Sequence, residues 1–88
     1  MLFTVILENI DAGKRVAVFK GDTAEEVTNR IKDTVKIPDG HEWAKYRHED
    51  GVWFVFDPEH ENPDTAAECE TTTFLTVKPT ELGVWIVD

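Results

Sequence analysis

The chain has 88 residues, of which 41% are hydrophobic and 31% are charged, and its formal net charge is −9. A chain of this length forms one domain, residues 1–88, and has little room for the deep enclosed pocket that most enzymes need. Its negative charge repels the phosphate backbone, so we do not expect it to bind nucleic acid directly. We expect a binding protein with no enzymatic activity and no cofactor.

The negative charge is concentrated in residues 39–70, which hold ten carboxylates against two bases and contribute −8 of the −9. Residues 1–38 contain six acids and six bases, and residues 71–88 contribute the remaining −1. Acidity confined to one block of sequence predicts one acidic face. Such a face favours a larger protein as the partner, with a basic contact surface on that partner as one option.

Cysteine content indicates the cellular compartment of the protein. Cys69 is the only cysteine and cannot form an intramolecular disulfide, which fits a reducing compartment. The apolar residues 1–7 include no basic residue and are followed at once by Glu8, unlike a signal peptide or a membrane span. We expect a cytoplasmic protein (in the host cytoplasm if it is viral) with no membrane partner.

Six segments are rich in β-branched and aromatic residues, which is typical of strands. The first two are joined by a turn that contains Gly13, and the third and fourth by Asp50-Gly51, so each pair predicts a hairpin. Residues 57–70 are predicted to form a polar loop, in which two prolines exclude a central strand. The predicted strands are residues 2–8, 15–20, 42–48, 52–56, 71–78 and 84–87.

One helix is predicted at about residues 23–36. Asp22 with Glu25 fits a capping box at its start. Thr23 with Glu26 offers the same geometry one residue later. The apolar residues of this segment recur at helical spacing and predict one buried stripe, which consists of Ala24, Val27, Ile31 and Val35.

Short motifs at the turns and along the helix are shared with a known kind of domain. They are Gly13-Lys14, Asp22-Thr23, Val27, Ile31, Ile37-Pro38 and Glu49-Asp50-Gly51. With the order of hairpin, helix and strands, residues 2–56 resemble a ubiquitin-like β-grasp domain. The resemblance implies an α+β fold of the β-grasp type, with a mixed sheet of five or six strands packed on one helix. The sequence ends in Trp85-Ile86-Val87-Asp88 instead of Gly-Gly, so conjugation to other proteins is not expected.

A metal site is not expected, although the chain contains several residues of types that bind metals. The separations along the set His41, His48, His60 and Cys69 are seven, twelve and nine residues, which match no closed zinc spacing.

The acidic segment suggests a more specific hypothesis. Asp57, Glu59 and Glu61 alternate, so an extended backbone would align them on one side about 7 Å apart, close to the spacing of backbone phosphates. Small acidic phage proteins that inhibit restriction, CRISPR or polymerase complexes are similar in size and charge. A solvated loop that only aids solubility is the alternative. The patch would be extended by Asp64, Glu68 and Glu70.

Trp43 and Trp53 support a different binding mode, because an exposed tryptophan on a sheet face can anchor a partner. The alternative is that at least two of the three tryptophans, which include Trp85, belong to the core. We therefore expect an interaction module, an adaptor or inhibitor that docks on a larger protein through its sheet face or acidic loop. The alternative function is a phage-type nucleic-acid mimic that fills the basic cleft of a nuclease, polymerase or restriction/CRISPR complex with residues 57–70.

Overall fold

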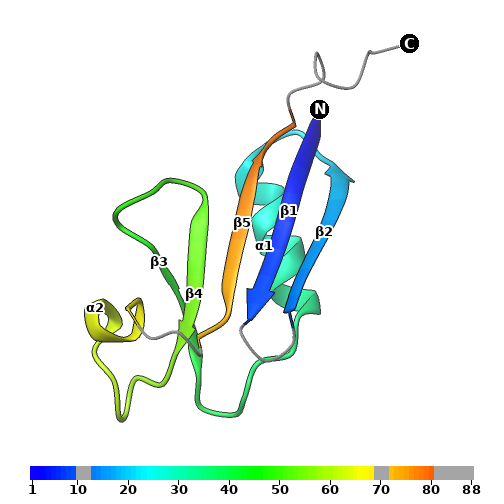
Figure 1. The fold of residues 1–88 in the computed structure, drawn as a ribbon. Coiled ribbons are helices and arrows are strands. Elements are labelled where there is room, and N and C mark those ends of the chain that lie inside the picture. Colours follow the sequence, from blue (N-terminus) through cyan, green and yellow to red (C-terminus); the bar gives the residue numbers. More distant parts are fainter. Residues whose placement is uncertain (10–12, 69–71, 81–88) are drawn as a thin grey trace.

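The computed structural model describes residues 1–9, 13–68 and 72–80, and these residues form one five-stranded sheet and two helices (Figure 1). The longer helix packs on one face of the sheet and the short helix lies over the other face at one end. The elements are β1 (Leu2–Asn9), β2 (Gly13–Lys20), α1 (Ala24–Thr34), β3 (Glu42–Lys45), β4 (Val52–Phe56), α2 (Pro63–Ala66) and β5 (Phe74–Pro79).

The strand order is β2-β1-β5-β4-β3, and every neighbouring pair in the described chain is antiparallel. The prediction of a β-grasp-like mixed sheet is therefore wrong. The reason lies in the return from β4 to β5: the Val55 N–H donates to the Thr73 carbonyl, and the Thr72 hydroxyl donates to the Val55 carbonyl. The chain thus re-enters the sheet at the end where β4 left it. β5 must then run antiparallel to β4 and, in this sheet, to β1 as well.

Alternate side chains of β1 form the centre of the core between the sheet and α1. Phe3 and Val5 are buried and Leu7 packs against them, so these alternate residues share one face of the sheet. Phe3 lies opposite Phe19 in the β1–β2 pair, and Val5 lies opposite Val77 in the β1–β5 pair. Since successive side chains of a strand point to opposite faces, each strand gives one row to α1 and one row to the other face.

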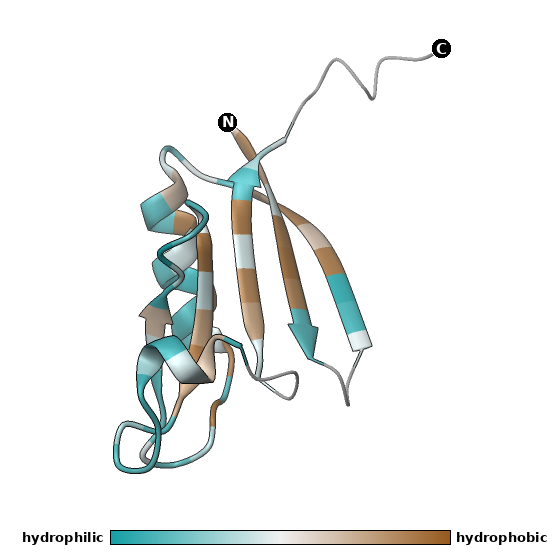
Figure 2. Ribbon diagram, turned by 60° about the vertical axis from the view of Figure 1, so that its left-hand side comes forward, coloured by the Kyte–Doolittle hydropathy of each residue, from teal (hydrophilic) through white to brown (hydrophobic). Residues whose placement is uncertain are grey.

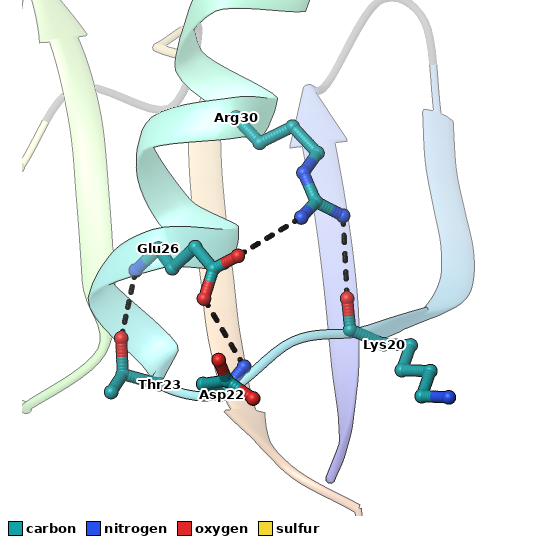
Figure 3. Close-up of polar contacts among 5 residues, drawn as sticks. All are labelled: Lys20, Asp22, Thr23, Glu26 and Arg30. Atoms are coloured by element: carbon teal, nitrogen blue, oxygen red, sulfur yellow. Dashed lines mark hydrogen bonds and ion pairs between the residues drawn. The ribbon is translucent and has the colours of Figure 1, made fainter.

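Thr23 caps the N-terminus of α1. The Glu26 N–H donates to Thr23 Oγ1 at 3.1 Å, and the Glu26 carboxylate accepts from the Asp22 N–H at 3.2 Å (Figure 3). Of the two helix starts that the sequence allows, the one with Thr23 and Glu26 therefore forms, with the Glu26 carboxylate bonded to the N–H of Asp22 instead of that of Thr23. Arg30 bonds to the Glu26 carboxylate and also donates to the Lys20 carbonyl, each at 3.3 Å. These contacts tie the first turns of α1 to the end of β2.

The predicted apolar stripe of α1 is confirmed. Val27 and Ile31 are buried, and Ala24 and Val35 pack at the margins of the same cluster. The helix is shorter than predicted and ends at Thr34, because Val35 has an extended backbone with ψ of 123°. The buried residues of this main core are Phe3, Val5, Val27, Ile31, Leu75 and Val77.

A second, smaller core lies on the other face of the sheet, over β4. Phe54 and Phe56 are buried there together with Ala66 of α2. Tyr46 closes the cluster in edge-on contacts, with its ring centroid 6.4 Å from that of Phe54 and 6.1 Å from that of Phe74. The β3–β4 hairpin is therefore apolar on both faces, with α1 on one side and α2 on the other.

The prediction of a polar loop throughout residues 57–70 is wrong where α2 forms. The Asn62 side chain caps this helix by accepting from the Asp64 N–H at 2.9 Å. Pro63 fits the first helical position, where the N–H that proline lacks would have no helical partner. Pro63 does exclude a central strand, as the sequence indicated, but it also favours a helix start.

The other predicted strands are confirmed with shifted ends. β2 begins two residues earlier, at Gly13, and β3 ends earlier, at Lys45. The predicted final strand at residues 84–87 lies outside the described residues. None of the helices in the described ranges has the length and apolar composition needed to cross a membrane.

The predicted turn at Asp50-Gly51 forms and leads to a stability prediction. Gly51 has φ of +78°, and a Cβ there would lie 2.6 Å from the Val77 carbonyl oxygen. We expect Gly51→Ala to lower the free energy of unfolding by about 2–4 kcal/mol, because it combines backbone strain with a clash against β5. Urea unfolding followed by tryptophan fluorescence measures this change.

Gly40 provides the matched control. It also has positive φ, +81°, but no atom lies within 4 Å of where its Cβ would be. Gly40→Ala should therefore carry the backbone strain alone, about 1 kcal/mol. Equal losses in the two variants would show that the approach of Gly51 to β5 does not constrain this turn.

Candidate protein-interaction surface

Apolar side chains lie on the face of β1 and β2 that points away from α1, which we call the outer face. No described element covers this part of the sheet, and hydrophobic residues recur along both strands (Figures 1 and 2). Val16 and Val18 of β2 are 59% and 50% exposed. Val16 lies opposite Ile6 on β1, and Val18 lies opposite Thr4. Two exposed valines at alternate positions of one strand form a continuous apolar patch.

β2 is also an edge strand. The Gly21 N–H donates to the Met1 carbonyl at 3.1 Å. Met1 and Gly21 continue the β1–β2 register, so this bond shows which opposite pairs of the ladder are hydrogen-bonded. The backbone groups of odd-numbered β2 residues therefore face β1, and those of Lys14, Val16 and Val18 point to the open edge. β2 has eight residues, no proline and an unbroken register with β1, so its edge can pair with a further strand.

A hollow of about 210 Å³ lies between α1 and β2 on the other side of this edge, and we call it the α1–β2 groove. Its surface is almost entirely apolar. The groove exists because α1 packs chiefly over β5 and does not extend fully over the edge strand. Its lining residues are Val5, Leu7, Arg15, Val16, Ala17, Phe19, Ile31, Thr34 and Val35.

The edge strand is basic in a chain that is strongly acidic. Residues 13–20 include Lys14, Arg15 and Lys20 and no acid, and all three basic side chains are exposed. A further hollow of about 290 Å³ continues toward the start of β2, where Arg15 and Lys36 line it. The free edge of β2 therefore carries positive charge at both of its ends.

The acidic residues at the other end of the molecule do not lie on an extended backbone. The Glu61 N–H donates to the Asp57 carbonyl at 2.8 Å and so closes a turn over residues 57–61. Glu61 Oε1 accepts from the Asp57 N–H at 2.8 Å, and Asp57 Oδ1 accepts from the Glu59 N–H at 3.0 Å. The expected alignment about 7 Å apart along one side is therefore wrong. Two of these three carboxylates stabilise their own turn.

The remaining acidic candidates lie on and after α2. Asp64 Oδ2 lies 2.6 Å from a guanidinium nitrogen of Arg47, and both side chains are exposed. Such surface pairs contribute about 0–1 kcal/mol to stability. Glu68 is exposed, and Glu70 lies outside the described residues.

A mixed hollow of about 310 Å³ lies beside these acids, between β3, β4 and α2. Within residues 1–9, 13–68 and 72–80, no three His, Cys, Asp or Glu side chains come close enough to hold a metal ion. Charged side chains of both signs surround an aromatic floor in this hollow. It is lined by Lys45, Tyr46, Arg47, His48, Phe54, Pro63, Asp64, Ala67 and Glu68.

Trp43 and Trp53 lie on the α1 side of the sheet and pack against the main core. Lys32 of α1 places its Nζ 3.9 Å from the centroid of the Trp53 ring. The Trp43 Nε1 is buried without a hydrogen-bond partner among the described residues. Both tryptophans are therefore half-buried at the margin of the main core, and their role as binding anchors remains a prediction. Trp85 lies outside the described residues.

The sequence prediction did not single out Val16 and Val18. The signal was the uninterrupted apolar run Val16-Ala17-Val18-Phe19, which places apolar side chains on both faces of one strand. Such a run is typical of a strand buried on both sides. At the edge of a sheet with a helix on one face only, it leaves one row exposed.

Comparison with known protein families, with curated proteins and with solved structures finds no match to this chain. The resemblance of residues 2–56 to ubiquitin-like domains and the similarity to small acidic phage inhibitors therefore stay predictions. The functional assignment depends on the surface described above.

The position of Trp53 leads to a prediction that separates core from surface. Trp53→Ala should lower the free energy of unfolding by about 2–4 kcal/mol, because it opens a void beside α1. The control Val16→Thr keeps the shape of an exposed, β-branched side chain and should change stability by about 0.5 kcal/mol or less. Both are measured by urea unfolding. If Trp53→Ala leaves stability unchanged, Trp53 is a surface residue and becomes a candidate anchor again.

Proposed function

We propose that this protein is a non-enzymatic interaction module that docks on a larger protein as an adaptor or inhibitor. The observation that carries this proposal is the outer face at the edge of the sheet, where Val16 and Val18 are exposed side by side on a strand with an open edge. When a partner covers apolar residues of this kind and removes them from water, the complex is stabilised by about 25 cal/mol for each Å² of apolar surface buried.

The charges around this surface indicate the character of the partner. Lys14 and Lys20 lie at the two ends of the valine row, on the same face of β2. Basic residues around an apolar centre favour a partner surface with carboxylates around its own apolar centre. The acidic segment at residues 39–70 repels such a partner from the opposite end of the molecule, so the charge distribution also orients the encounter.

We also place this function in the cytoplasm, or in the host cytoplasm if the protein is viral. The basis is the single Cys69, which suits a reducing compartment.

A nucleic-acid mimic is the second candidate. It is supported by the exposure of Glu59, Glu61 and Glu68 around the acidic turn and α2. Against it stand the turn geometry and the pairing of Asp64 with Arg47, which reduce the number of carboxylates free to contact a basic cleft. In this alternative the partner is a nuclease, polymerase or restriction/CRISPR complex.

Two sets of substitutions separate the candidates. Val16→Thr with Val18→Thr makes the outer face polar, and Glu59→Gln, Glu61→Gln and Glu68→Gln make the acidic end more neutral. Glutamine retains an acceptor oxygen for the bond to the Asp57 N–H, so the turn is preserved. Each tagged variant is used to capture proteins from bacterial lysate at low and high salt, and the captured proteins are quantified by mass spectrometry.

The proposal predicts a partner that is retained at high salt, lost by the valine variant and kept by the glutamine variant, because apolar contacts are not screened by ions. Mimicry predicts the opposite pattern: retention only at low salt, displacement by DNA, and loss with the glutamine variant. That opposite pattern would overturn the proposal in favour of the mimic.

A further inference from the structure

We propose that the open edge of β2 and the α1–β2 groove together bind an extended, acidic segment of the partner protein, which adds to the sheet as a strand beside β2. This inference builds on the proposed function and specifies its partner. Three features of the described residues support it: unpaired backbone groups, an apolar groove on the same edge, and a local excess of positive charge.

The backbone of β2 limits how such a segment can pair. Lys14, Val16 and Val18 present their N–H and C=O groups to the open edge. At Lys20 the edge is occupied by the Arg30 side chain, which donates to the Lys20 carbonyl at 3.3 Å and is held in turn by Glu26 (Figure 3). The added strand is therefore stopped at one end and pairs over residues 14–18, which needs a segment of about five or six residues.

The side chains of the segment would alternate between two apolar surfaces. One row enters the α1–β2 groove. The volume of this groove, about 210 Å³, is smaller than that of pockets that hold small molecules and is large enough for side chains. The other row stands beside Val16 and Val18 on the outer face and covers the flank of each valine that is turned to the open edge. Backbone pairing gives such an interface affinity, and the groove gives it selectivity for apolar residues at every second position.

Charge selects an acidic segment over a second copy of this chain. β2 carries Lys14, Arg15 and Lys20 with no acid, and Glu8 of β1 lies opposite Lys14, so pairing two β2 strands would bring six basic side chains together beside only two such carboxylates. A segment with carboxylates flanking its apolar residues would instead place opposite charges beside both ends of the edge. The complementarity therefore favours an acidic segment of another protein.

The test uses a fluorescein-labelled peptide of sequence Glu-Glu-Val-Thr-Val-Thr-Val-Glu-Glu and a matched peptide with lysine in place of glutamate. Binding to the full chain is measured by fluorescence anisotropy. The acidic peptide should bind more tightly than the basic one by about tenfold or more. On binding, hydrogen exchange at the Val16 and Val18 amides should slow, whereas the amides of odd-numbered β2 residues, already bonded to β1, should change little.

Two variants test the backbone and charge contributions separately. Val16→Pro removes an N–H that points to the open edge, leaves the β1 ladder intact and should abolish binding. Val16→Thr retains this N–H and loses only the apolar surface of Val16, so its binding should be weaker than that of the wild type but still measurable. If Val16→Pro fails to fold, Lys14→Glu with Arg15→Glu provides the second test. It should reverse the preference, so that the basic peptide binds more tightly than the acidic one.

Several outcomes would overturn this inference. One is equal binding of both peptides, and another is binding that leaves the Val16 and Val18 amides unprotected. A third is protection of these amides that rises with protein concentration when no peptide is present, which would identify a second copy of the chain as the occupant. Binding that appears only after removal of residues 81–88 would identify the chain's own C-terminal residues as the occupant. If peptide binding fails while capture of a partner still depends on Val16 and Val18, the proposed function stands without this inference.

Discussion

The fold depends on the insertion of β5 between two hairpins, β1–β2 and β3–β4, that do not pair with each other in the described sheet. Leu75 lies opposite Leu7 on one side and Trp53 on the other, and it is fully buried. Because β5 pairs with β1 and β4, the hairpins become one sheet and α1 gains a continuous apolar surface to cover. Because β5 pairs with β1 and not with β2, β2 stays at the edge of the sheet. The candidate binding surface is thus a consequence of the strand order. β1 lies between β2 and β5, so β2 has one neighbour and an open edge.

Local structure could be predicted well from the sequence, since the hairpins and α1 are encoded by contacts between neighbouring residues. The Thr23 cap, the glycine turn at Gly51 and the apolar stripe of α1 are all short-range patterns. The direction of β5 could not be predicted in the same way, because it depends on bonds from residues 72 and 73 to Val55 across a connection with no strand signal. The mixed sheet implied by the resemblance to ubiquitin-like domains therefore did not form.

The candidate sites show the same division between local and long-range information. Acidic residues are obvious in a sequence, but whether they are available to a partner depends on local bonds, and Asp57 and Glu61 are used within their own turn. Conversely, Val16 and Val18 look like core residues until the strand order is known. Exposure of an apolar strand is a property of its place in the sheet, and composition alone does not reveal it.

The late position of β5 in the chain also affects synthesis on the ribosome. Both hairpins and α1 precede it, so they are made before the strand that joins them. Until Leu75 and Val77 emerge, the main core lacks two of its six buried residues, and the edges of β1 and β4 have no partner. At synthesis rates of about 5–20 residues per second, this period lasts on the order of seconds. The nascent chain therefore exposes two additional strand edges to pairing with other chains before its own sheet is complete.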